Sequence, residues 1–288
     1  MPAAQSPSGP LVLVCADAEL GNSVAALLVG AGHLVQALER GPGVLGQLRG
    51  DPPRLAVVEV GSDADAVRLV EELRAAPETL AVPVITLGAA ETLRVRVHAS
   101  GNVHKLLPRP VPGRELLEAV KSALALQTES ARIQAQPLTS DPAVRDATAL
   151  LFAAEQELML AWLEETRREP GVRGAPELTD EAILDQVPQV FHGLLLMLQH
   201  DEPADLMAQN EPLIELIHHH ARGHHEHGLP PESIVREYQI LRGLVVPRLR
   251  EELGADVVLA VLGELTPLLD AAIRHTISEC VRLAQADA

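Results

Sequence analysis

The sequence predicts a chain of two parts, a doubly wound α/β domain followed by an all-helical bundle. Up to about residue 125, short continuous apolar runs alternate with amphipathic stretches, which is the pattern of a parallel sheet covered on both faces by helices. Beyond residue 140 only helical periodicity and helix-capping signals remain. The 288 residues, of which 47% are hydrophobic, are enough for a buried core in each part.

Five apolar segments are the predicted strands, and the stretches between them have helical spacing. We expect the strands to be parallel and joined by right-handed crossovers, so that their carboxyl ends form one functional edge. The predicted strands are 11–15, 33–38, 55–60, 82–88 and 103–109. We divide the chain into a disordered tail at 1–9, the α/β domain at 10–125, a helical connector at 126–143 and the all-helical domain at 144–288.

The connector is expected to continue the last helix of the α/β domain. This helix starts after Pro112-Gly113, and neither Gly nor Pro follows before Pro137. Its apolar residues form a stripe that either a partner helix or the second domain can cover, and we expect a homodimer. The stripe consists of Leu116, Leu117, Val120, Leu124 and Ile133.

Five helices are predicted in the second half, most of them opened by a proline or a capping side chain. Asp141-Pro142, for example, places an N-cap residue before a proline at the first helical position. The helices are expected at about 142–168, 179–199, 210–228, 230–254 and 256–285, with a loop at 169–176. This half has no strand signal, which predicts an all-helical bundle.

The first domain resembles the receiver domain of response regulators, the CheY-like superfamily with a flavodoxin-like fold. The resemblance covers about residues 10–125 and depends on the order of LVLVCADAEL, PRLAVVEV, VPVITLG and LLPRPV along the chain. It implies a pocket at the strand ends in which a phosphoryl group is accepted. The residues that stand at the positions of this pocket are Cys15, Ala16, Asp17, Glu59, Gly88 and Arg109.

These residues depart from the chemistry of a working receiver. Cys15 and Ala16 replace the acidic pair that holds Mg²⁺, a hard ion that requires oxygen ligands. Glu59 stands in place of the phosphoacceptor aspartate, and Gly88 in place of the hydroxyl-bearing residue. Arg109-Pro110 replaces the Lys-Pro of the family, whose proline is cis. The sequence therefore predicts a pseudo-receiver that does not accept phosphate.

Glu59 has two interpretations. Its carboxylate can hold a permanent negative charge against Arg109 and imitate the phosphorylated state. The same two residues can instead form a partly buried ion pair in a relic pocket, because such pairs are only probabilistic signals of function.

The histidines are concentrated in one predicted helix, where six of the twelve lie in HHHARGHHEHG at 218–228. His220, His224 and His227 continue one helical stripe, on which imidazoles at i and i+4 can ligate a metal ion or an apolar pocket can hold haem. A helix end with solvent-exposed histidines, favourable to the helix dipole, explains the same pattern. Phosphotransfer to an exposed histidine is a third alternative, with His192 or His225 as the acceptor.

A second resemblance lies in the helices around these histidines. Its residues are His220, Arg222, Gly228, Pro230, Pro231, Glu232, Ser233, Arg236, Glu237, Tyr238, Leu241 and Arg242, with Ala161, Trp162 and Leu163 in the first helix of the bundle. Together they look like the helical N-terminal domain of RsbT co-antagonist (RsbRD-type) proteins, over about residues 145–285. The resemblance implies a sensory or scaffolding bundle in stressosome-like stress signalling, without known catalysis. We expect Glu237 to form an ion pair inside this bundle.

The net charge of −17 is concentrated in the second half, which carries 27 acidic and 12 basic residues from 126 on. An acidic surface repels phosphate backbones and anionic lipids, so we expect neither nucleic acid nor a membrane as a partner. The sequence shows no signal-peptide pattern and no apolar run of membrane length, which predicts a cytoplasmic location.

Together these features predict a non-enzymatic bacterial signalling adaptor, in which a phosphorylation-independent pseudo-receiver and a sensory bundle act through protein–protein contacts. We expect no catalytic residue and no cofactor, and signalling proteins such as kinases or stress-response regulators as partners. The alternative is a metal, haem or small-molecule sensor that uses the helix His218–His227.

Overall fold

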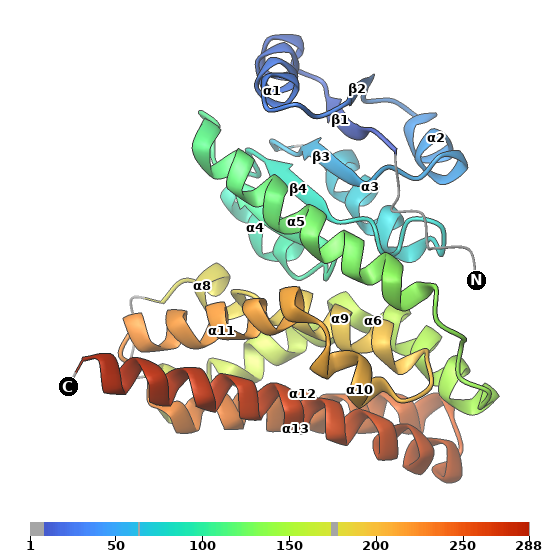
Figure 1. Cartoon of the computed structure of the whole chain (residues 1–288), viewed down its shortest axis with the longest axis vertical. Helices are drawn as coiled ribbons and strands as arrows, with labels where there is room; N and C mark the ends of the chain where they lie inside the picture. Colours follow the sequence, from blue (N-terminus) through green and yellow to red (C-terminus); the bar gives the residue numbers. More distant parts are fainter. Residues whose placement is uncertain (1–8, 63, 174–177, 288) are drawn as a thin grey trace. The chain divides into compact units, whose positions relative to one another are not determined.

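The computed structural model describes residues 9–62, 64–173 and 178–287. The predicted tail at 1–9 lies outside these residues except for Gly9. The chain divides into two compact units, residues 1–135 and 136–288, and each is described by itself (Figure 1). The boundary between them falls within the segment 126–143.

The first unit is built around a parallel sheet of five strands. Their order across the sheet is β2-β1-β3-β4-β5, and every adjacent pair is parallel. The strands are β1 (Leu11–Cys15), β2 (Val35–Glu39), β3 (Leu55–Glu59), β4 (Val84–Leu87) and β5 (Val103–Leu107). This is the flavodoxin-like order of a doubly wound sheet, so the predicted fold class is confirmed.

Helices cover both faces of the sheet. They are α1 (Ala18–Gly30), α2 (Val44–Gly50), α3 (Ala64–Ala75), α4 (Glu91–His98) and α5 (Gly113–Gln134). α1 and α5 bury Leu28 and Leu116 in the core on one face, whereas α2 and α3 bury Leu48 and Leu73 in the core on the other. β3 is buried at all its positions, as expected of a central parallel strand. α2 was not predicted from the sequence, because a helix of 7 residues is too short to show a helical period.

The apolar stripe of α5 is largely used inside the first unit. Leu116 and Val120 are buried in the core against the sheet, and Leu117 and Leu124 pack at the edge of the same core. These four side chains therefore have partners within their own unit, and the homodimer stays a prediction.

The described part of the second unit is a helical bundle. Its helices are α6 (Pro142–Thr166), α7 (Pro170–Arg173), α8 (Asp180–Leu184), α9 (Val187–Leu198), α10 (Pro203–Ala208), α11 (Glu211–Glu226), α12 (Pro231–Glu252) and α13 (Ala255–Ala286). The long helices α6, α11, α12 and α13 lie where helices were predicted. The predicted loop at 169–176 contains the single turn of α7, and its last three residues lie outside the described residues. The short helix α10 was not predicted.

The single helix predicted at 179–199 is wrong, because the chain breaks it into α8 and α9. Asp185 lies at the break with a φ of 39°, in the left-handed region that a continuous helix cannot contain. Pro188 falls in the first turn of α9, where its missing N–H has no helical partner to lose. The apolar spacing continues through this break although the backbone does not, and periodicity alone therefore misses it.

The core of the second unit contains carboxylates as well as apolar side chains. Glu155 on α6 is fully buried, and both of its oxygens lie 3.1 Å from Nδ1 of His192 on α9. Trp162 is also fully buried and donates from Nε1 to the backbone carbonyl of Glu237 at 2.9 Å. Because buried polar groups need partners, these contacts fix α6 against α9 and against α12.

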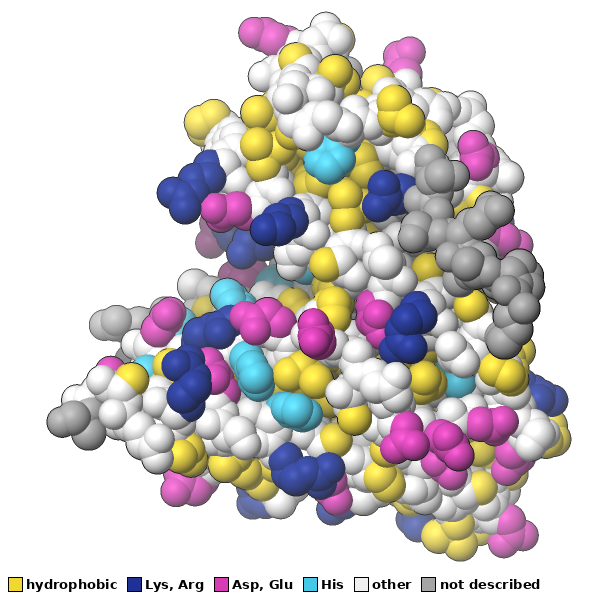
Figure 2. Space-filling view, in the orientation of Figure 1, with side chains coloured by type: hydrophobic (Ala, Val, Ile, Leu, Met, Phe, Trp, Pro, Cys, Tyr) yellow, Lys and Arg dark blue, Asp and Glu magenta, His cyan; other side chains and the backbone are white. Residues whose placement is uncertain are grey.

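Acidic side chains are spread over the visible face of the helical unit, as Figure 2 shows. This distribution agrees with the excess of Asp and Glu from residue 126 on. In the part of the chain that the structure describes, no helix combines the length and the apolarity needed to cross a membrane.

Candidate functional site

The receiver-like pocket lies at the carboxyl ends of the strands in the first unit. Cys15 ends β1 and Glu59 ends β3, while Gly88 and Arg109 follow β4 and β5. The strands are parallel, so these positions share one edge of the sheet. The Arg109-Pro110 peptide bond is cis, as the resemblance implied.

Glu59 is the buried centre of this pocket. Its Oε2 accepts hydrogen bonds from the backbone N–H groups of Ala16 at 2.7 Å and Asp17 at 3.0 Å. Its Oε1 lies 3.1 Å from Nη2 of Arg109. Both oxygens of this buried carboxylate are therefore held by donors, one of which is the charged guanidinium of Arg109.

Asp17 is the second carboxylate of the pocket, and both of its oxygens are also engaged. Oδ1 caps α1 by accepting from the backbone N–H groups of Glu19 and Leu20. Oδ2 lies 2.9 Å from Nη2 of Arg109. The hydrogen bond from Leu20, together with the charge of Arg109, lowers the pKa of Asp17.

The side chain of Arg109 covers Gly88. Gly88 has a φ of 67°, and a Cβ atom built on it would lie 2.5 Å from Cδ of Arg109. Real Cβ atoms essentially never approach another atom so closely. The space in which the receiver resemblance implies a hydroxyl is thus filled by the stem of Arg109.

The donor set does not fit the Mg²⁺ ion that the receiver resemblance implies. Mg²⁺ requires oxygen ligands in octahedral geometry, but all four carboxylate oxygens of Glu59 and Asp17 are already held by backbone N–H groups or by Arg109. The nearby thiol adds no ligand at neutral pH, because burial and the charge of Glu59 raise the pKa of Cys15 to about 11. A cation would have to displace Arg109 to bind here.

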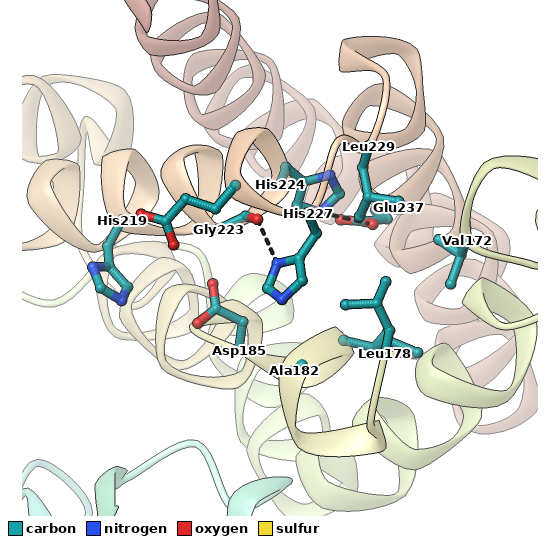
Figure 3. Close-up of a pocket in the computed structure, with 12 residues that line it drawn as sticks. Val172, Leu178, Ala182, Asp185, His219, Gly223, His224, His227, Leu229 and Glu237 are labelled. Atoms are coloured by element: carbon teal, nitrogen blue, oxygen red, sulfur yellow. Dashed lines mark hydrogen bonds and ion pairs between the residues drawn. The ribbon is translucent and has the colours of Figure 1, made fainter. Parts of the chain in front are cut away.

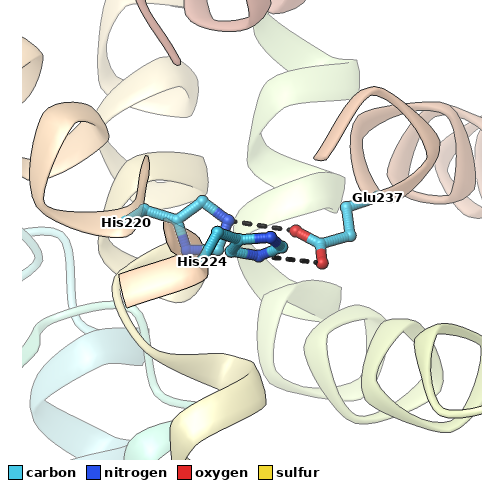
Figure 4. A group of neighbouring side chains, drawn as sticks. All are labelled: His220, His224 and Glu237. Atoms are coloured by element: carbon cyan, nitrogen blue, oxygen red, sulfur yellow. Dashed lines mark hydrogen bonds and ion pairs between the residues drawn. The ribbon is translucent and has the colours of Figure 1, made fainter. Parts of the chain in front are cut away.

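A second cluster of polar side chains lies between α11 and α12 in the helical unit (Figure 4). His220 and His224 are one turn apart on α11, and Glu237 comes from α12. Nε2 of His220 lies 3.0 Å from Oε2 of Glu237, and Nε2 of His224 lies 3.1 Å from Oε1. All three residues are buried, so this cluster belongs to the interior of the bundle.

The other ring nitrogens of the two histidines also have partners. Nδ1 of His220 lies 3.1 Å from Oδ2 of Asp185, at the break between α8 and α9. Nδ1 of His224 lies 3.3 Å from Oγ of Ser233, and that hydroxyl donates to the carbonyl of Pro230 at 2.6 Å. Each imidazole is therefore held at both of its nitrogens.

The charges of this cluster act against the effect of burial. Burial by itself lowers the pKa of His220, but hydrogen bonds and charges from Asp185 and Glu237 outweigh it and raise that pKa. Burial disfavours the ionised carboxylate of Glu237, yet the two histidines lower its pKa. The pKa of Asp185 is lowered in the same way by His220. The directions of all three shifts favour ionised groups at neutral pH.

A pocket of about 250 Å³ adjoins this cluster (Figure 3). Val172 and Leu178 form part of its apolar lining, and Asp185, His224 and Glu237 belong to its polar lining. A water molecule or a small ligand in this pocket would therefore reach two members of the cluster.

The third histidine of the predicted stripe lies outside the cluster. α11 ends at Glu226, and His227 is its C-cap, exposed to solvent with Nδ1 2.7 Å from the carbonyl of Gly223. Helical spacing would place His227 on the stripe only if the helix extended through it. The structure therefore brings together two of the three predicted histidines.

The histidines named for phosphotransfer differ from each other in their surroundings. His192 is buried against Glu155, which does not fit the exposed imidazole that phosphotransfer requires. His225 is partly exposed, and its Nε2 lies 2.8 Å from Oδ2 of Asp287.

The contacts that complete the cluster were not predicted from the sequence. An ion pair was expected for Glu237 but not with the histidines, and no role was expected for Asp185. One signal was available, since the short turn after α11 makes α11 and α12 antiparallel neighbours and residues at similar distances from the turn face each other. No sequence pattern indicated Asp185, which depends on the break between α8 and α9.

The family match found by comparison with known proteins lies within the second unit. Residues 156–286 match the family model described as the RsbT co-antagonist protein rsbRD N-terminal domain. No curated protein matches the chain.

Three solved structures illustrate the structural likeness. A CheY-like response regulator receiver domain protein from Methanospirillum hungatei JF-1 is 21% identical, with 41% of this chain and 94% of that chain covered and a TM-score of 0.36. A sensor protein from Polaromonas sp. JS666 is 20% identical, with 41% and 98% covered and a TM-score of 0.36. Full-length FixJ from B. japonicum is 18% identical, with 72% and 97% covered and a TM-score of 0.38.

The sheet order and the family match bear out the two resemblances found in the sequence, each over its own part of the chain. The sheet order of the first unit is that of the flavodoxin-like receiver fold. The family match covers most of the second unit. The chain combines a receiver-type α/β unit with a helical domain that matches the RsbRD N-terminal family.

Proposed function

We propose that this protein is a non-enzymatic bacterial signalling adaptor, in which a receiver-like unit that takes no phosphoryl group is joined to a sensory helical unit. The observation that supports this most directly is the engagement of Glu59 by Arg109 and two backbone N–H groups. A phosphoacceptor carboxylate must present an oxygen to the incoming phosphorus, and neither oxygen of Glu59 is available for that.

Arg109 is proposed to keep the pocket of the receiver-like unit in one fixed arrangement. Its guanidinium bridges Glu59 and Asp17, and its stem fills the space over Gly88. A phosphorylation signal needs a site that differs between two chemical states, whereas this site holds one charge distribution permanently. The stimulus would therefore enter through the helical unit, and the receiver-like unit would serve as a binding surface of fixed structure.

The partners in this proposal are other signalling proteins. The matched family is named for RsbT co-antagonists, which supports a kinase or a stress-response regulator of the RsbT type as the partner, in a cytoplasmic, stressosome-like assembly. The acidic surface of the second half also favours a protein with a basic face over nucleic acid or an anionic membrane.

Intact-mass measurement tests the phosphorylation-independent part. The full chain is incubated with Mg²⁺ and acetyl phosphate, next to a working receiver treated in the same way. We expect the working receiver to gain one phosphoryl group and this chain to gain none. A stoichiometric phosphoryl adduct that maps to Glu59 or Asp17 would overturn the proposal.

Calorimetric titration with a purified RsbT-type kinase tests the adaptor part. We expect binding whose affinity is the same before and after treatment with acetyl phosphate. Binding that requires the treatment would contradict phosphorylation independence, and transfer of phosphate from the kinase to this chain would contradict the adaptor role.

A further inference from the structure

We propose that His220, His224 and Glu237 form a binding site for a divalent transition-metal ion of the zinc class. The two histidines supply Nε2 from α11, and the glutamate supplies its carboxylate from α12 (Figure 4). Two imidazoles and one carboxylate are the protein ligands of many catalytic zinc sites, in which a fourth position is left open. This proposal does not depend on the adaptor function.

The hydrogen bonds around the cluster orient both histidines as ligands. Nδ1 of His220 faces the carboxylate of Asp185, which can only accept a hydrogen bond, so this nitrogen carries the proton. The hydroxyl of Ser233 donates to the carbonyl of Pro230 and so accepts from Nδ1 of His224. In a metal-bound form with a proton on each Nδ1, Nε2 of both rings would be the ligand atom, on the side that faces Glu237. Partners of this kind on the outer nitrogen are the usual support of metal-ligating histidines.

A metal ion can lie between the rings and the carboxylate, in place of the protons that otherwise join them. A lone pair on Nε2 and a carboxylate oxygen repel each other at 3.0 and 3.1 Å unless a proton or a metal ion lies between them. With both histidines neutral in the metal-bound form, the carboxylates of Asp185 and Glu237 would supply a formal charge of about −2, which one divalent cation balances. A single metal ion therefore satisfies both contacts and the charge of the group.

The distances allow such an ion after a small adjustment. The ligand atoms of the three residues all lie within 4.8 Å of one another. Metal–ligand bonds of about 2.0–2.1 Å in a tetrahedral site separate the ligand atoms by about 3.3 Å. The two nitrogen–oxygen contacts would thus lengthen by a few tenths of an ångström, and any wider separation, up to 4.8 Å, would have to shorten through changes in side-chain torsion.

The adjoining pocket provides access to the open position. It contacts His224 and Glu237 and has a volume of about 250 Å³ (Figure 3). Water or a small anionic or neutral donor there would complete the coordination. A bound ion would also join α11 to α12 and, through Asp185, to the break between α8 and α9, so that metal occupancy is communicated to three places in the bundle.

Spectroscopic titration of the full chain, expressed without an added histidine tag and stripped with a chelator, tests this proposal. We expect one equivalent of Co²⁺ to bind with the visible d–d absorption of a four- or five-coordinate site, and Zn²⁺ to displace it. His224→Ala and Glu237→Gln should lose this absorption. Asp185→Asn leaves the three ligands in place and should weaken binding by about 10- to 100-fold.

The matched control replaces the histidines of the same run that lie outside the cluster, in a fourfold variant to asparagine at His218, His219, His225 and His227. This variant should bind one equivalent of Co²⁺ with the spectrum of the unchanged chain, which also tests the site if a core variant fails to fold. Absence of stoichiometric binding in the unchanged chain would overturn the proposal. Loss of binding in the fourfold variant would do the same, because it would assign the metal to the surface histidines.

Discussion

Gly88→Ala should destabilise the receiver-like unit by about 2–3 kcal/mol, and Arg109 should account for about 1 kcal/mol of that loss. The φ of 67° at Gly88 is in the left-handed region, which costs an alanine roughly 1–2 kcal/mol. The new Cβ would also lie 2.5 Å from Cδ of Arg109, so that side chain must move and give up its ion pair with Glu59. Arg109 is 38% exposed, and this pair is therefore valued as a screened one, at about 1 kcal/mol.

A double-mutant cycle separates the two contributions. In an Arg109→Ala background, Gly88→Ala should cost only the backbone part, about 1–2 kcal/mol. All four aromatic residues of the chain lie beyond residue 150, so Trp162 fluorescence reports the helical unit alone. Urea unfolding is therefore followed by far-UV circular dichroism and by hydrogen exchange of peptides from β3 and β4, and the Trp162 transition serves as the unchanged control.

Two outcomes would refute this reasoning. An equal cost of Gly88→Ala with and without Arg109 would show that the arginine stem does not fill the space over residue 88. A cost below about 0.5 kcal/mol in the unchanged background, the range of an ordinary surface substitution, would show that neither the φ value nor the contact matters.

Two further predictions concern a thiol and a helix cap. The Cys15 thiol should alkylate slowly at pH 8 and faster as the pH rises toward its pKa of about 11. Glu59→Gln should speed the reaction, because the charge of Glu59 helps to raise that pKa. The rates are measured by mass spectrometry in a Cys280→Ser background, and equal rates with and without Glu59→Gln would argue against this. Asn210→Ala should destabilise the helical unit by about 1 kcal/mol, because the Asn210 side chain accepts from the N–H of Leu213 at the start of α11. In urea unfolding followed by Trp162 fluorescence, Asn210→Ser should retain most of the stability, and equal losses in both variants would exclude the cap.

The fold of the first unit could be predicted because several of its strands are short apolar runs between stretches with helical spacing. β3 is buried at all five positions, and the shortness of its apolar run, rather than any period, indicated a strand. The same pattern predicted a functional edge at the carboxyl ends of the parallel strands, and the resemblance to receiver domains placed Glu59, Asp17 and Arg109 there, where the structure has them. What the pattern could not predict was the path of the Arg109 side chain across Gly88, which depends on packing between residues 21 positions apart.

The histidine cluster was predictable only in part. Helical spacing placed His220 and His224 on one face, and the structure has them there. The same spacing included His227, which lies beyond the end of α11. Glu237 and Asp185 reach the cluster from other helices, and a periodic pattern within one helix has no information on what packs against it.

The buried contact between Glu155 and His192 constrains how the bundle can move. Sliding α9 along α6 by one turn, about 5.4 Å, would part the buried carboxylate of Glu155 from the ring of His192. The loss of a buried hydrogen bond costs roughly 1–3 kcal/mol, a noticeable share of the stability of an ordinary domain. The two helices are therefore locked in a single register, and a stimulus that acts on the bundle has to rotate or tilt them as a coupled pair.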